Sequence, residues 1–318
     1  MRFVALGTSI FITRCIEGLR DSGHEVCMLL ALPERLRPNN SDDLKPFASD
    51  RRIVYFEVGD INGGEALATI QSVGPDFIIS AWPRILRRSI LEIPRCGVIG
   101  SHPTALPFNR GRHPLHWLIT LGYSESRLTF FRMDEGIDSG PILLQIPFRI
   151  ESSDSIGDVV ARVNAAAYDG ALQLGRIISA KGQPMGLPQD HSRANYWRKR
   201  TPHDVTLDLR MSADMIIRTI RSFTAPYPCA NLLYEQCLIK IVDAEVAPVE
   251  IPVDDLMRME PGKVLDVSET CIRVKANDRI VDLKSKDPLP KEIRQAKYIH
   301  PPSRYLIDHV GILASQLT

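Results

Sequence analysis

Residues 2–30, RFVALGTSIFITRCIEGLRDSGHEVCMLL, decide the fold of this chain of 318 residues. The apolar run RFVAL ends at a GTS turn, a helix-like stretch runs from Phe11 to Ser22, and a second apolar run, EVCMLL, follows. A strand, a helix and another strand at this spacing form a βαβ unit, whose two strands are parallel in one sheet. The segment therefore predicts an α/β fold.

The same pattern continues along the first half of the chain. Residues 65–73 have helical spacing, and apolar residues from Ile156 to about Ser179 repeat at the helical period, which predicts one long helix. Further predicted strands are Ile53–Val58, Asp76–Ser80, Cys96–Ile99 and Leu128–Met133. We expect an open, mostly parallel, Rossmann-like sheet.

The composition changes after the long helix. Residues 180–200 are rich in Gly, Pro and polar residues without a period, which indicates a linker or a strap laid over the surface. A helical pattern at Met211–Phe223 precedes several short strand patterns, typical of a small β-barrel or sandwich. We expect an α/β domain at 1–183, a linker or strap at 184–206, and a smaller β domain at 207–318. The predicted strands of that domain are Ala230–Tyr234, Leu238–Ala244, Gly262–Val267, Cys271–Lys275 and Arg279–Leu283.

Composition excludes several classes of protein. The 39 basic residues nearly cancel the 38 acidic ones, and 44% of residues are hydrophobic, so neither a disordered chain nor a strongly basic nucleic-acid clamp is expected. No apolar run reaches the roughly 18 residues that a membrane span needs, and the N-terminus shows no signal-peptide pattern. The six cysteines form no CxxC pair, and His and Cys lack metal-ligand spacing. We expect a cytoplasmic protein without a metal.

The segment 97–117, GVIGSHPTALPFNRGRHPLHW, carries the densest set of unusual residues. His102 directly follows a predicted strand, at the place where open α/β sheets bind ligands. Residues 133–140, MDEGIDSG, form an acidic loop after another strand. His102 and Asp138 on these two loops could meet, and such a pair can hold an imidazolium that stabilises an oxyanion. The simpler alternative is a turn histidine bonded to the backbone.

These motifs resemble the folate-dependent formyltransferase family, which includes methionyl-tRNA formyltransferase and the sugar-nucleotide N-formyltransferases. That family shares Asn-x-His, a Pro-bearing segment, Arg-Gly and Asp-x-Gly, which are matched here by SHPTALP at 101–107, NRG at 109–111 and IDSG at 137–140. Residues 79–94 are similar to the family's folate-contacting loop and helix. Residues 220–228 and 261–264 are similar to its OB-like C-terminal domain.

The resemblance implies that an amine attacks the formyl carbon of N10-formyltetrahydrofolate through a tetrahedral oxyanion. His102 would donate to the oxyanion and take part in proton transfer, with Asp138 as its carboxylate. The cofactor contacts that it implies are Trp82, Arg84, Ile85, Leu86, Asp134 and Gly136. The implied substrate contacts are Ser101, Thr104, Asn109, Arg110, Arg112, His113, Tyr196 and Trp197.

One position departs from the family pattern, because Gly100 stands where the catalytic Asn should be. Losing one oxyanion donor typically costs about 2.7–4 kcal/mol. A backbone N–H of residue 100 or 101, the Ser101 hydroxyl or His113 could replace it. Ser101 should face away, since strand side chains alternate, and His113 could equally pack under Trp117. Otherwise the enzyme is slow and uses a highly nucleophilic amine, or the chain is an inactive folate-binding protein.

The acceptor amine has two main candidate classes, tRNA and nucleotide-linked amino sugars, and other small amines such as hydroxyornithine or aminoacyl groups are a further alternative. A tRNA substrate needs a basic surface, whereas residues 32–47, LPERLRPNNSDDLKPF, are short and carry acids as well as bases. Residues 109–122 resemble the sugar-nucleotide branch of the family, and residues 196–204 resemble the strap of the enzyme that formylates UDP-4-amino-4-deoxy-L-arabinose. Both favour a nucleotide-linked amino sugar. Basic clusters at 84–88 and 198–200 argue for tRNA unless they are solvated loops. Monomer or homodimer is left open.

Overall fold

The structure is a computed structural model that describes residues 1–235, 237–248 and 250–305. Contacts between Cα atoms divide it into two compact units. The first holds residues 1–115, 124–151 and 158–199, and the second holds 116–123, 152–157 and the chain from 200 onward. The expected linker at 184–206 is therefore shared, because its residues up to 199 belong to the first unit.

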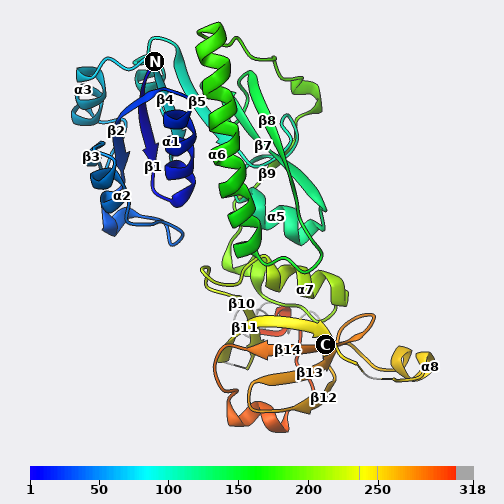
Figure 1. The fold of residues 1–318 in the computed structure, drawn as a ribbon. Coiled ribbons are helices and arrows are strands. Elements are labelled where there is room, and N and C mark those ends of the chain that lie inside the picture. The colour runs from blue at the N-terminus through cyan, green and yellow to red at the C-terminus, as the bar shows by residue number, and fades with distance from the viewer. Residues whose placement is uncertain (236, 249, 306–318) are drawn as a thin grey trace, which may run out of the picture. The chain divides into compact units, whose positions relative to one another are not determined.

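The first unit contains a seven-stranded sheet with the order β3-β2-β1-β4-β5-β7-β8. The five strands from β3 to β5 in that order are parallel, and β7 and β8 are antiparallel to their neighbours. The open, mostly parallel sheet predicted from the sequence is thus confirmed (Figure 1). The strands are β1 Arg2–Gly7, β2 Glu25–Ala31, β3 Val54–Glu57, β4 Phe77–Ala81, β5 Gly97–His102, β7 Glu125–Arg132 and β8 Ile142–Arg149.

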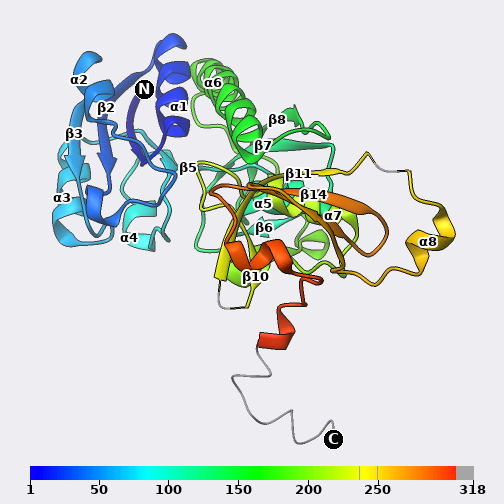
Figure 2. The same cartoon turned by 90° about the horizontal axis from the view of Figure 1, so that it is seen from below.

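The long helix predicted after the sheet is present as α6, Ile156–Lys181. It lies beside α1, Ile10–Asp21, in both views (Figure 1 and Figure 2). Gly18 makes this approach possible, since a Cβ there would lie 2.4 Å from the carbonyl oxygen of Tyr168. In the turn after α1, His24 Nε2 is 2.8 Å from the carbonyl oxygen of Gly175. The shorter helices are α2 Lys45–Asp50, α3 Gly64–Ser72, α4 Arg88–Leu91 and α5 Pro114–Leu121.

The second unit is built on a five-stranded antiparallel sheet with the order β10-β11-β14-β13-β12. Helix α7, Ala213–Arg221, begins at Ser212, whose side chain accepts from the Met215 N–H, and buries Ile216 and Ile220 in the core of this unit. The small β domain is thus confirmed, and α8, Val253–Met257, stands out from its sheet. The strands are β10 Ala230–Tyr234, β11 Cys237–Val246, β12 Val264–Val267, β13 Cys271–Lys275 and β14 Ile280–Ser285.

The segment after α6 is a strap that pairs with the motif loop. Its strand β9, Tyr196–Trp197, runs parallel to β6, Arg110–Gly111. This pairing requires glycine at 111, where φ is +104° and a Cβ would lie 2.4 Å from the carbonyl oxygen of Trp197. Single turns of 3₁₀ helix occur at Glu34–Leu36, His191–Arg193, Pro202–Val205 and Lys291–Gln295. Over the described ranges, no helix has both the length and the apolar character to cross a bilayer.

Candidate active site

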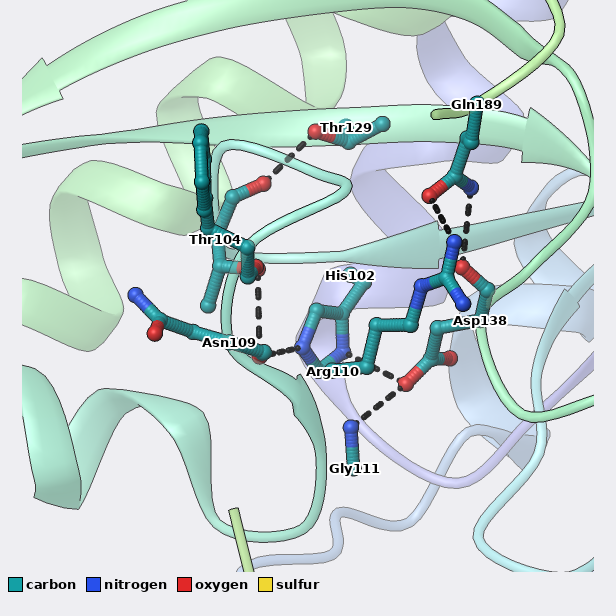
Figure 3. Close-up of polar contacts among 9 residues, drawn as sticks. His102, Thr104, Asn109, Arg110, Gly111, Thr129, Asp138 and Gln189 are labelled. Atoms are coloured by element: carbon teal, nitrogen blue, oxygen red, sulfur yellow. Dashed lines mark hydrogen bonds and ion pairs between the residues drawn. The ribbon is translucent and has the colours of Figure 1, made fainter. Parts of the chain in front are cut away.

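His102 ends β5, and Asp138 lies in the loop that follows β7. Their side chains meet, with His102 Nδ1 3.5 Å from Asp138 Oδ2 (Figure 3). The other ring nitrogen, Nε2, donates to the backbone carbonyl of Asn109 at 2.8 Å. Both interpretations of this histidine therefore hold: it is bonded to the backbone, and it also faces the carboxylate.

Asp138 is held in an uncommon backbone conformation with φ at 51°. Its Oδ2 accepts the backbone N–H of Gly111 at 2.9 Å, so one oxygen faces both β6 and His102. A carbonyl can only accept, so Nε2 of His102 carries a proton, and Nδ1 is free to exchange a second proton with the carboxylate. The pair can therefore hold an imidazolium or release it, as proton transfer in an acyl-transfer site requires.

The loop between His102 and β6 is braced by Thr104. This residue is fully buried, its hydroxyl donates to the Phe108 carbonyl at 2.8 Å, and its own carbonyl accepts from the Thr129 hydroxyl at 2.6 Å. The expectation that Thr104 contacts a substrate is therefore wrong, since no part of it reaches the surface. Its function is to shape the loop that supplies the acceptor for His102.

Arg110 is also inside the protein, at 1% exposure. Its guanidinium donates to the Tyr196 hydroxyl at 2.9 Å and to Gln189 Oε1 at 2.7 Å, and it lies 3.3 Å from His191 Nδ1. The expected contact between Arg110 and a substrate is thus corrected, because the side chain is buried and its Nη1 and Nη2 groups are bonded to residues of the strap. Tyr196 itself remains 58% exposed beside the loop.

The rest of the motif loop follows the strap. Asn109, with φ at 61°, donates its N–H to Asn195 Oδ1 at 2.8 Å and accepts at its own Oδ1 from Asn195 Nδ2 at 2.9 Å. Arg112 is exposed, and its N–H donates to the carbonyl of Trp197, which is half-buried. His113 is half-buried with φ at 55°. Arg112 and Trp197 therefore meet where the motif loop and the strap pair, and both are expected substrate contacts.

Apolar side chains fill the space beside Gly100. A Cβ at this position would lie 2.8 Å from Met133 Cγ and 2.9 Å from Phe131 Cζ, on the face of β5 that also carries His102. Ser101 is half-buried and, by strand alternation, points to the opposite face. The wall beside His102 is thus apolar where the family motif places an amide.

The loop expected to contact the cofactor follows β4, which pairs with β5, so it lies at the sheet edge that carries His102. The indole N–H of Trp82 is buried and has no partner among the described residues. Arg84 donates to the Gly59 carbonyl at 2.9 Å, and Ile85 is 74% exposed. Leu86 is buried in the core, which corrects its expected cofactor contact.

Asp134 and Gly136 shape the loop that carries Asp138. Oδ1 of Asp134 accepts the Gly136 N–H at 3.0 Å and the Ser139 hydroxyl at 2.6 Å. Both expected cofactor contacts are exposed on this turn. Across the described part of the chain, no group of three or more His, Cys, Asp or Glu side chains is placed to hold a metal ion.

Sequence reasoning missed two strap residues that touch the site, Gln189 and Asn195. Both are amides in a segment without a period, so only the polar run QDHSRAN between Pro188 and the aromatic pair signalled them. Gln189 donates to the carbonyls of Asp138 and Gly140. The strap therefore contributes residues to the site in addition to covering the surface.

The fold and the site define an α/β enzyme with an imidazole–carboxylate pair at one edge of its sheet. Residues 1–174 match the formyl transferase family, and residues 199–299 match the formyl transferase C-terminal domain. The chain belongs to this family and is a formyltransferase.

Relatives of known name match most of the chain. A methionyl-tRNA formyltransferase of Alkaliphilus oremlandii is 30% identical over 89% of this chain and 90% of its own length. One from Pseudomonas syringae pv. tomato is 30% identical over 86% of this chain and 88% of its own. Among solved structures, the sugar 3N-formyltransferase WlaRD, with dTDP and 5-N-formyl-THF, has a TM-score of 0.64 at 16% identity, covering 91% of this chain and 99% of that one.

Proposed function

We propose that this chain transfers a formyl group from N10-formyltetrahydrofolate to the amine of a nucleotide-linked amino sugar. The observation that carries the acceptor class is Tyr196, an exposed aromatic ring paired through β9 to the loop whose Gly111 N–H binds Asp138. A tyrosine ring in this position suits stacking on a base or a sugar face.

In the proposed reaction, the folate co-substrate supplies the formyl group. His102 exchanges a proton with Asp138, whose carboxylate faces Nδ1, while Nε2 keeps its bond to the Asn109 carbonyl. In its imidazolium form the ring stabilises negative charge on the formyl oxygen through its positive charge. The Gly111 N–H fixes the position of the Asp138 carboxylate, and the Asn109 carbonyl fixes that of the His102 ring. The loop after β4 fits the co-substrate, since the buried Trp82 N–H offers a donor whose burial without an acceptor is costly.

The segment after β2, residues 32–47, supports a small acceptor over tRNA. Its Arg37 is paired with Glu57 at 2.7 Å, and its Asp42 accepts the Ile10 N–H at the start of α1 at 2.8 Å. A carboxylate at this helix N-terminus repels phosphate from the donors that would otherwise attract it. Arg200, from the second basic cluster, is buried, so that cluster presents less charge to solvent than its sequence suggests.

Methionyl-tRNA formyltransferase is the second candidate. It is favoured by the relatives of that name, which are 30% identical over nearly their whole length. A third outcome, an inactive folate-binding protein, is motivated by Gly100. The cytoplasmic location, the oligomeric state and the domain boundaries at 183 and 207 stay predictions.

The test is incubation of the enzyme with N10-formyltetrahydrofolate and two sets of acceptors, nucleotide-linked amino sugars and methionyl-tRNA, read as the mass gain of one formyl group. We expect formylated sugar nucleotide, with His102→Ala and Asp138→Asn reduced at least about a hundredfold. Formylated methionyl-tRNA alone would establish the second candidate. Folate binding without any formylated product would establish the third. Wild-type rates in both variants would remove these residues from the mechanism.

A further inference from the structure

Gln189 is the strap residue whose side chain bonds the turn that carries Asp138. It is 6% exposed, although the residues on both sides of it are exposed. Its Nε2 donates to the Asp138 carbonyl at 2.8 Å (Figure 3) and to the Gly140 carbonyl at 2.7 Å. Both amide hydrogens are thus spent on the turn that presents the catalytic carboxylate.

The orientation of this amide is determined by Arg110. A guanidinium carries only donors, so the contact at 2.7 Å between its Nη2 and Gln189 requires the amide oxygen on that side and the amide nitrogen on the turn side. Arg110 also donates to the Tyr196 hydroxyl. The buried Arg110 therefore fixes the orientation of the Gln189 amide and links Gln189 to Tyr196 within the strap.

The turn at Asp138 needs outside support. Its φ of 51° is unfavourable for a residue with a side chain, and residues 134–137 before it are exposed. The separation of 3.5 Å between Asp138 Oδ2 and His102 Nδ1 exceeds the 2.7–2.9 Å or so of a strong charge-assisted hydrogen bond. A small displacement of the turn therefore decides whether the carboxylate engages the imidazole.

We propose that Gln189 is a positioning residue for formyl transfer. It holds the Asp138 turn at the distance from which the carboxylate can exchange a proton with His102. This rests on the role given to the His102–Asp138 pair under the proposed function. Among the described residues, the hydrogen bonds of Gln189 go only to the turn and to Arg110, so it acts through Asp138 and not on a substrate.

Two substitutions separate the two halves of the amide. Gln189→Glu keeps an acceptor for Arg110 but turns a carboxylate oxygen towards the two carbonyls, and Gln189→Met removes all three contacts while keeping the size. The matched control is Gln183→Met, because Gln183 in the same segment donates its amide to the Cys96 carbonyl at 2.9 Å, away from the turn.

Hydrogen exchange at single backbone amides reads the position of Asp138 directly. The Gly111 N–H is bonded to Asp138 Oδ2, whereas the N–H groups of Arg110 and Arg112 are bonded to strap carbonyls. In Gln189→Glu we expect exchange at Gly111 to speed up at least tenfold while Arg110 and Arg112 keep their protection. Gln183→Met should leave all three unchanged. Unchanged protection at Gly111 in both Gln189 variants would overturn the proposal.

Kinetics supply the second readout. We expect kcat to fall at least tenfold in both Gln189 variants, with KM for either substrate changed less than threefold, since neither substrate contact is removed. A rise in KM with unchanged kcat would make Gln189 a binding residue and overturn the proposal. If the wild-type protein formylates no amine, the proposed function fails, and the Gly111 exchange still decides whether Gln189 positions the turn.

Discussion

At the residue scale, Gly100 shows how one missing side chain changes a site. The motif would place an amide beside His102, but Met133 and Phe131 occupy that space. The wall next to the reacting group is therefore apolar, and any replacement donor must come from elsewhere in the loop. An asparagine at position 100 would therefore need space that Met133 and Phe131 occupy, in addition to a hydrogen-bond partner.

Gly100→Asn should destabilise the protein by about 1–3 kcal/mol, because its Cβ would press on two packed side chains. We expect no gain in formyl-transfer rate. The penalty should be smaller in a Met133→Ala background, where the nearest atoms are gone, and the double-mutant cycle in urea unfolding measures this coupling.

Gly100→Ala is the control, since it adds the Cβ without the amide. A Gly100→Asn enzyme as stable as wild type and about a hundredfold faster would show that the site had merely lacked a donor.

At the element scale, the pairing of β6 with β9 joins the strap to the catalytic loop. Two-residue strands carry no period, so no pattern in the sequence could predict them. Strand β8 was missed for a related reason, since it is half-buried along most of its length and includes Pro147. Helix α5 did have a signal, Pro114 at its first position, which is typical of a helix start.

Gly111→Ala should break this pairing. A side chain at φ +104° costs about 1–3 kcal/mol in backbone strain alone, and the new Cβ also collides with the Trp197 carbonyl. We expect a loss of unfolding free energy together with a lower formyl-transfer rate, because the N–H of this residue binds Asp138.

Gly74→Ala is the matched control, since Gly74 has φ +54° and nothing within 4 Å of its Cβ position. It should lose only about 1–2 kcal/mol from the left-handed conformation and keep its activity. Equal losses of stability and activity in the two variants would show that the contact with Trp197 is unimportant.

At the scale of the whole molecule, composition and periodicity predicted both sheets, because each unit buries its own apolar core of alternating strand residues. The motif loops predicted the meeting of His102 with Asp138. Burial inside loops was beyond reach: Thr104, Leu86 and Arg110 were expected at a ligand surface and lie in the interior. A loop sequence does not say which of its side chains turn inward.

The stability of the molecule in acid should depend on Asp76 at the start of β4. Burial alone would raise the pKa of its carboxyl, but the Arg2 N–H and the Arg95 guanidinium outweigh burial and hold the pKa below its usual value. The unfolded value is about 3.9. Because the folded pKa is the lower one, this stabilisation is complete above the unfolded value and is lost as the pH falls through the folded one.

Asp76→Asn should therefore be less stable than wild type by about 1–3 kcal/mol at pH 7. The difference should begin to shrink as the pH falls below the unfolded value of about 3.9 and should go on shrinking through the lower folded pKa, as measured by urea unfolding at each pH. A difference that stays constant over this range would mean that the ionised carboxylate contributes nothing.

The strap also has a consequence for synthesis. The residues that hold the turn and the motif loop, 189–197, come after α6, whereas the sheet they serve ends at residue 149. During translation, the sheet can assemble before the catalytic loops have their supports. A growing polypeptide stopped after Lys181 would contain every strand of the large sheet, but the turn and the motif loop would lack the strap residues that hold them. The site can therefore become catalytically active only after the strap has left the ribosome.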